Sequence, residues 1–138
     1  MSFKKYQQYP IVQNFKREWA DKTITHAPIY CSVDLRDGNQ ALINPLTVEQ
    51  KLEYFKALVK MGFKQIEVSY PSASDTDFNF TRKLIEEDLV PDDVAIQILI
   101  PAKKEWIKKS VEAMKEVKNG IFHLYNPTNE FQRRVVFQ

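Results

Sequence analysis

The feature that most constrains the fold is a regular alternation of short apolar segments with amphipathic segments along residues 27–138. Strands are expected at residues 28–35, 63–70, 94–100 and 121–125. A segment with helical periodicity follows each of them, and successive units repeat after about thirty residues. The segment 94–100 is almost wholly apolar, which is typical of a strand covered on both faces. This order predicts a parallel sheet with helical crossovers.

The helical segments carry recognisable end signals. Thr47 and Gln50 match a capping box that opens the first helix, and Gly62 stands where this helix should stop. The second helix is expected to follow the polar turn 72–76 and to end before Pro91. The fourth is expected from residue 129 to residue 136. For the third helix, the spacing predicts a buried face formed by Ile107, Val111 and Met114.

The length of the chain restricts the architecture. A closed (β/α)₈ barrel takes about 250 residues and eight units, whereas this chain has 138 residues. The alternatives are half of such a barrel or a small open α/β sheet. Residues 1–26 are polar with scattered aromatic side chains, and we expect them to form an N-terminal arm outside a domain at 27–138. The three glycines are not clustered, which argues against a nucleotide-binding phosphate loop.

Composition and charge exclude several classes of protein. Twenty Lys and Arg against eighteen Asp and Glu give a net charge of +2, too balanced to indicate a nucleic-acid or acidic-membrane partner. No secretory leader or membrane-spanning apolar run is visible. Cys31 is the single cysteine, so it forms no intrachain disulfide, and its apolar surroundings predict a buried thiol. These features predict a cytoplasmic protein.

The candidate site centres on residues 31–40, where an apolar segment ends in the sequence Arg36-Asp37-Gly38. A guanidinium and a carboxylate at the end of a strand can hold an anion and a metal side by side. The same pattern is also typical of a simple turn with a surface ion pair. Glu67 lies between Ile66 and Val68 in an expected strand. If the Glu67 carboxylate is buried, it needs a partner, and Arg36 is the candidate. The alternative is that Glu67 lies at an edge of the sheet that is exposed to water.

Several stretches together resemble the 2-isopropylmalate synthase family. The matching segments are residues 21–28, 31–42, 66–74, 123–126 and 132–136. The core Leu-Arg-Asp-Gly-x-Gln at residues 35–40 is shared by the wider superfamily of homocitrate synthase, citramalate synthase and hydroxymethylglutaryl-CoA lyase. The resemblance implies an α/β fold that is the N-terminal half of a TIM (β/α)₈ barrel, with four β/α units and a truncated fourth helix.

The resemblance also implies an acyltransferase of leucine biosynthesis that condenses acetyl-CoA with 2-oxoisovalerate in a Claisen-type reaction. A divalent metal, Mg²⁺, Mn²⁺ or Zn²⁺, would chelate the 2-oxo acid, with Asp37 as a ligand and Arg36 steadying the oxyanion. In the absence of this resemblance, His123 would be interpreted as a core residue whose hydrogen bonds are formed within the protein. The residues that the resemblance assigns are catalytic Arg36, Glu67 and Gln40, substrate-binding His123, Ser69 and Asn126, and metal-binding Asp37.

Three departures from the family pattern leave alternatives open. Lys103 stands where the family has an arginine, and Pro127 changes the loop after the fourth strand. The pair of histidines (His-x-His) that the family carries on a late strand of the barrel is missing from this chain. We therefore expect a fragment that is inactive alone and completed by a C-terminal half or by a second copy in a homodimer. A citramalate synthase, a homocitrate synthase, a related lyase and a non-catalytic, self-associating half-barrel remain alternatives.

Overall fold

A four-stranded parallel sheet forms the centre of the fold, as the sequence predicts. The computed structural model describes residues 10, 22 and 24–137. The strands are β1 (Cys31–Ser32), β2 (Gln65–Ser69), β3 (Ala95–Pro101) and β4 (Gly120–Tyr125), and they lie side by side in chain order. Parallel strands added in sequence with helical crossovers are the topology of the first half of a TIM barrel.

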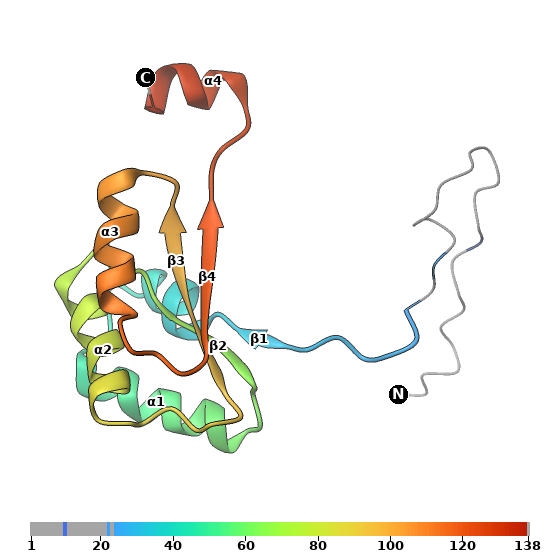
Figure 1. Ribbon diagram of the computed structural model, residues 1–138, viewed down its shortest axis with the longest axis vertical. Helices are drawn as coiled ribbons and strands as arrows, with labels where there is room; N and C mark the ends of the chain where they lie inside the picture. The colour runs from blue at the N-terminus through green and yellow to red at the C-terminus, as the bar shows by residue number, and fades with distance from the viewer. Residues whose placement is uncertain (1–9, 11–21, 23, 138) are drawn as a thin grey trace.

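Helices α1 (Val48–Lys60), α2 (Asp75–Glu86) and α3 (Lys104–Ala113) lie on one side of the sheet (Figure 1). The predicted capping box of α1 is present, because Thr47 Oγ1 accepts from the Gln50 N–H at 3.3 Å and the Gln50 side chain accepts from the Thr47 N–H at 3.0 Å. Gly62 has a φ of +97°, in the left-handed region that favours glycine after a helix.

The core lies between the sheet and these helices. Alternate residues of β3 point toward the helices and are buried, and the helices contribute large apolar side chains to the same layer. This layer contains Ile66, Val68, Ile96, Ile98, Ile100, Phe55, Leu58, Phe80 and Leu84. No described helix packs on the opposite face of the sheet, which we call the open face. Polar side chains of the strands gather there.

The first strand is much shorter than predicted. Instead of residues 28–35, only Cys31–Ser32 pair with β2, and the chain then enters a π-helical turn, η2 (Asp34–Gly38). The Val33 carbonyl accepts from the N–H of Asp37 at 2.8 Å and from that of Gly38 at 3.4 Å. Ile29 and Tyr30, interpreted as strand residues, are 70% and 73% exposed. Local hydrogen bonds around Val33 therefore override the apolar pattern.

The buried face of α3 also differs from the prediction. Ile107 and Val111 lie 36% and 52% exposed, whereas Ser110 and Ala113 are buried together with the predicted Met114. The face that packs on the sheet therefore carries two small side chains beside Met114, and the hydrophobic pattern does not indicate it. Cys31 was likewise predicted to be buried and is only half-buried. Burial still raises the pKa of its thiol.

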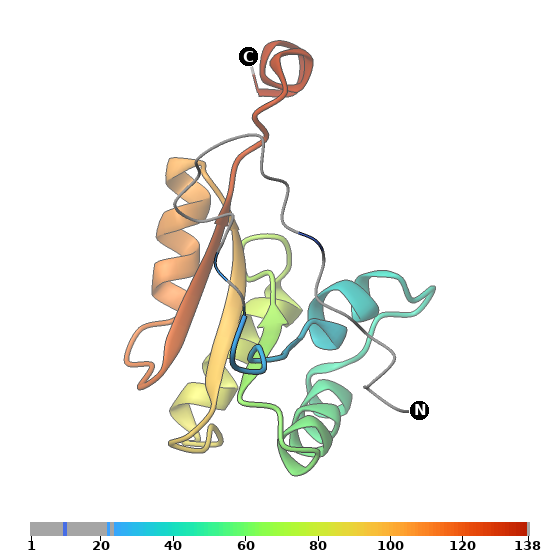
Figure 2. The ribbon, with the colours of Figure 1, turned by 90° about the vertical axis from the view of Figure 1, so that its right-hand side faces the viewer.

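The fourth helical segment begins at the predicted place, with the Asn129 side chain accepting from the N–H of Phe131 at 2.9 Å. It comprises α4 (Glu130–Gln132) and a π-helical stretch, η3 (Arg133–Phe137). Figure 2 shows it beyond the end of β4, apart from the other helices. Most of the predicted arm at 1–26 lies outside the described residues. Among the described helices, none has the length and apolarity to cross a membrane.

Candidate active site

Three adjacent strands each contribute a polar side chain to one group on the open face. Ile96 and Ile98 point toward the helices, so Gln97 between them points the other way. Glu67 is paired with Gln97 across the β2–β3 ladder, and His123 is paired with Leu99 across the β3–β4 ladder. Glu67, Gln97 and His123 therefore share one face of the sheet.

Glu67 is the centre of this group, and its side chain is fully buried. The Arg36 Nε–H donates to Oε1, and the Gln97 amide donates to Oε2. His123 Nδ1 lies 2.7 Å from the same Oε2. The predicted contact between Arg36 and Glu67 is thus present, and the alternative of a water-exposed edge position is wrong. We call Arg36, Glu67, Gln97 and His123 the Glu67 cluster.

The cluster keeps Glu67 ionised. Burial by itself would raise the pKa of Glu67, but the hydrogen bonds from His123, Gln97 and Arg36 outweigh it and hold this pKa below its ordinary value. An ionised carboxylate only accepts hydrogen bonds. The ring nitrogen of His123 that faces Glu67 must therefore carry a proton, and in the neutral ring Nε2 is left as an acceptor.

Arg36 reaches the cluster from η2, directly after β1. Its side chain is 13% exposed and lies between the buried Glu67 and the 53% exposed Asp37, which accepts from Nη1. The Ser32 hydroxyl donates to Asp34 Oδ2 at 2.6 Å across the start of this turn. The π-helical turn therefore holds a guanidinium at the open face, with a carboxylate beside it on the solvent side.

The described residues offer a divalent metal one candidate ligand, Asp37. Asp37 supplies a hard carboxylate oxygen, the type of donor that Mg²⁺ and Mn²⁺ prefer. Within residues 24–137, no group of three or more His, Cys, Asp or Glu side chains comes close enough to hold a metal ion. The described residues therefore fit one ligand of such a site but do not form the site.

The other predicted site residues lie outside the cluster. Ser69 is buried and its hydroxyl lies 2.6 Å from Thr81 Oγ1 of α2, so it points toward the helices. A register shift between Glu67 and Ser69 explains this, because an extra residue in β2 reverses the side on which Ser69 emerges. Gln40 and Asn126 are exposed, and no hydrogen bond described here joins them to Glu67. Their roles stay predictions.

Sequence reasoning missed Gln97. The signal was available, because Gln97 is the single polar residue in the apolar segment 94–100. A polar side chain within an otherwise apolar strand is expected to have a hydrogen-bond partner, and Glu67 on the neighbouring strand provides it. The same reasoning that marked Glu67 would have marked Gln97.

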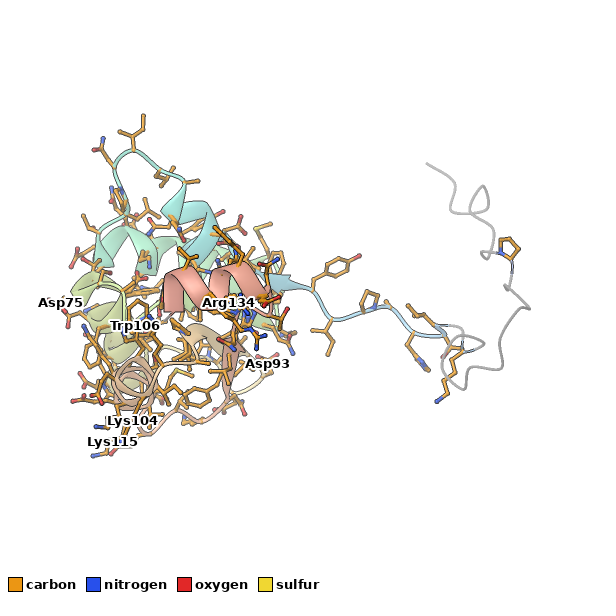
Figure 3. The ribbon with its side chains drawn as sticks, turned by 90° about the horizontal axis from the view of Figure 1, so that it is seen from above. Asp75, Asp93, Lys104, Trp106, Lys115 and Arg134 are labelled. Carbon is orange, nitrogen blue, oxygen red and sulfur yellow. The ribbon has the colours of Figure 1, made fainter. Side chains whose placement is uncertain are left out.

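The carboxyl end of the sheet is lined by aromatic side chains. The rings of Tyr70 and Trp106 have centroids 5.8 Å apart at an angle of 54°. Burial raises the pKa of the Tyr70 hydroxyl. Lys103, at the position where the resemblance expects an arginine, places its ammonium 5.8 Å from the centre of the Trp106 ring. In Figure 3, Trp106 lies on the side of the helices, whereas Arg134 lies on the segment after β4.

Comparison with known proteins decides the family. A family model described as HMGL-like matches residues 27–138. The chain belongs to the HMGL-like family. The matched range covers the whole sheet, η2 and every residue of the Glu67 cluster. The cluster is therefore part of the family domain.

Three curated relatives of this HMGL-like chain are named 2-isopropylmalate synthase. The 2-isopropylmalate synthase of Clostridium acetobutylicum is 56% identical over 138 residues, which are 100% of this chain and 25% of that protein. The enzymes of the same name from Acetoanaerobium sticklandii and Parafrankia sp. are 52% and 53% identical over 100% and 99% of the chain, and 24% of each relative. The chain spans about a quarter of the length of these relatives.

Proposed function

We propose that this chain supplies the first half of the catalytic barrel of a 2-isopropylmalate synthase, which condenses acetyl-CoA with 2-oxoisovalerate in the cytoplasm. One observation carries the proposal: a buried, ionised Glu67 binds one side chain from each of the other three β/α units, so that all four units meet on the open face. Active sites of barrel enzymes lie at the carboxyl end of the strands. The identity of 52–56% to synthases supports the substrate pair.

In this proposal Arg36 stabilises charge that develops on the 2-oxo acid. Its Nε–H is held by Glu67 and one Nη1–H by Asp37. A guanidinium has five N–H donors in a fixed plane, so the others are directed away from these two carboxylates. A donor that is fixed before the reaction stabilises an oxyanion without reorganising. Glu67 is therefore assigned an orienting role.

His123 is proposed to contact the substrate through Nε2. Its Nδ1–H is committed to Glu67, and its side chain is 45% exposed. This leaves an acceptor nitrogen on the accessible side of the ring, which can bind a substrate hydroxyl or receive a proton. The Gln97 amide donates to the same carboxylate oxygen and fixes it from the β3 side.

The metal and acetyl-CoA belong to the proposal as well. Asp37 is proposed as the ligand that this chain gives to a divalent cation, which when bound would polarise the keto group of the 2-oxo acid. Gln40 and Asn126 are proposed to meet substrate at the mouth, where both are exposed. Ser69 contacts Thr81 in this structure, so any contribution of Ser69 to substrate binding requires a change at the end of β2.

A chimaera tests the function. Residues 1–138 replace the matching segment of the Clostridium acetobutylicum relative, and release of the free thiol of CoA is followed with a thiol reagent. We expect turnover with 2-oxoisovalerate in the usual enzyme range of about 1 to 10³ per second. The 138-residue chain alone is expected to release no thiol, because Asp37 cannot hold a six-coordinate cation by itself.

The same assay separates the alternatives. A chimaera that prefers pyruvate or 2-oxoglutarate would replace the proposal with a citramalate or homocitrate synthase. A chimaera that folds but releases thiol with none of these acids contradicts an acyltransferase function for this half. Turnover by the isolated chain that EDTA abolishes would contradict the proposal that it needs completion.

We also propose that the unpaired edge of β4 drives association of the isolated chain. Phe122 and Leu124 are 47% and 57% exposed on this strand, and an uncovered apolar edge recruits other strands. Light scattering is expected to give a dimer or larger species rather than a 16.2 kDa monomer. Leu124→Lys should restore the monomer. Ile43→Lys, at a 98% exposed loop position, should not, and a stable wild-type monomer would refute the proposal.

A further inference from the structure

The carboxyl end of β2 lacks a neighbouring strand on one side. β1 pairs only with Gln65 and Ile66, because the chain leaves the sheet after Ser32 to form η2. The later backbone groups of β2 therefore have no β1 partner. Buried backbone groups without partners cost free energy, so these groups require hydrogen bonds from elsewhere.

Two side chains of the helix layer supply those hydrogen bonds. Lys51 of α1 donates from Nζ to the Val68 carbonyl at 3.3 Å. Asp77 of α2 accepts from the Tyr70 N–H at 2.8 Å through Oδ2. Lys51 Nζ also donates to Oδ1 of Asp77, so the two side chains form one connected pair. The pair thus binds β2 on both sides of Ser69.

The burial of Lys51 is unusual for a lysine. Its side chain is 0% exposed, and Nζ lies 5.2 Å from the centre of the Phe80 ring. Burying two charges costs about as much as their attraction returns, and an apolar pair of similar size is often as stable. Stability alone is therefore a weak reason for this pair. Its contacts with Val68 and Tyr70 point to control of the strand path.

That path decides the geometry of the Glu67 cluster. The register shift lies between Glu67 and Ser69, next to the Val68 carbonyl that Lys51 binds. The shift leaves Glu67 on the open face and turns Ser69 toward Thr81. We infer that Lys51 and Asp77 are a positioning pair for the Glu67 cluster, which they hold in place through the bulged end of β2. The catalytic part of this inference rests on the proposed function.

The first test reads the cluster directly and requires no activity. In the ¹⁵N NMR spectrum of the 138-residue chain, the Arg36 Nε–H and Gln97 side-chain amide signals report their hydrogen bonds to Glu67. Lys51→Met should shift both signals, because the released end of β2 moves the carboxylate. The matched control is Arg82→Met, which removes another tether: Arg82 donates to the Ala113 and Lys115 carbonyls at 3.3 Å and 2.7 Å.

Both substitutions are expected to lower Tm, but only Lys51→Met should change the two signals. If the two signals are unchanged in both variants, the pair is only structural and the inference is overturned. Equal shifts in both variants would overturn it as well. If Lys51→Met does not fold, Asp77→Asn decides in the same way. It keeps an oxygen for the Tyr70 N–H and removes the charge that holds Lys51.

The second test connects positioning to catalysis. In the chimaera, Lys51→Met should lower kcat by about 10- to 100-fold with little change in KM, as expected when a catalytic group is misplaced. Arg82→Met should leave kcat unchanged at temperatures where it is folded. If the wild-type chimaera is inactive, the proposed function fails, while the NMR result still decides whether the pair positions Glu67. Shifted signals with an unchanged kcat would overturn the catalytic part.

Discussion

Arg36→Ala is expected to lower kcat of the chimaeric synthase by about 10²- to 10³-fold, equivalent to about 2.7 to 4 kcal/mol of lost transition-state stabilisation. The guanidinium is fixed between Glu67 and Asp37, so its remaining donors are aimed before charge develops on the substrate. KM for the 2-oxo acid should change little, because the interaction is strongest in the transition state. Steady-state kinetics at saturating metal would measure both constants.

Arg36→Lys separates the chemical effect from a loss of stability. A lysine retains a positive charge for the buried Glu67 but lacks the planar set of donors. It should therefore restore much of the stability that Arg36→Ala loses while kcat stays low. Arg134→Ala provides a control, because Arg134 is 78% exposed and pairs with Glu130 within its own helical segment. If Arg36→Ala raised KM alone, Arg36 would be a ground-state binding residue.

Glu67→Gln is expected to lower the free energy of unfolding by about 3 kcal/mol, the usual cost of removing one partner of a buried ion pair. The glutamine side chain has nearly the same shape but only one acceptor oxygen for three donors, those of Arg36, Gln97 and His123. Urea denaturation of both proteins would measure the difference. The matched change is Glu87→Gln, which breaks an ion pair with Lys83 on the surface of α2 and should have no measurable effect.

The stability difference between the wild type and Glu67→Gln is expected to depend on pH. The pKa of Glu67 in the folded chain is lower than its ordinary value of 4.5. A lowered folded-state pKa contributes stability that is fully present above the ordinary value and is lost as the pH falls through the folded value. The stability difference between the wild type and Glu67→Gln should therefore be constant at neutral pH and shrink below pH 4.5. A difference that does not change on acidification would contradict an ionised Glu67 at the centre of the cluster.

Local signals in the sequence determined the order of the elements. The apolar segment 94–100 became β3, and the Thr47–Gln50 capping box opens α1. The expected partnership of Arg36 with Glu67 was also correct, because a carboxylate in a covered strand has few other ways to be buried. These features depend on neighbours in the chain or on one strong physical requirement, so the sequence was sufficient to predict them.

The tertiary structure alone decided where β1 ends and which way Ser69 and α3 face. Hydrogen bonds around Val33 end β1 after two residues, and the register shift in β2 turns Ser69 away from Glu67. The face of α3 that packs on the sheet carries the small residues Ser110 and Ala113, which a hydrophobic pattern does not indicate.

Lys51 shows the same division between sequence and structure. It shares the buried face of α1 with Phe55, and its position was visible in the sequence. Its function was not visible, because its partners, Val68 and Asp77, lie 17 and 26 residues away and meet it only in the folded chain. The sequence by itself determined the family, the parallel β/α order and the charged residues of the site. Only the packing of β2 against η2, α1 and α2 determined how those residues face one another, because that geometry depends on contacts between distant segments.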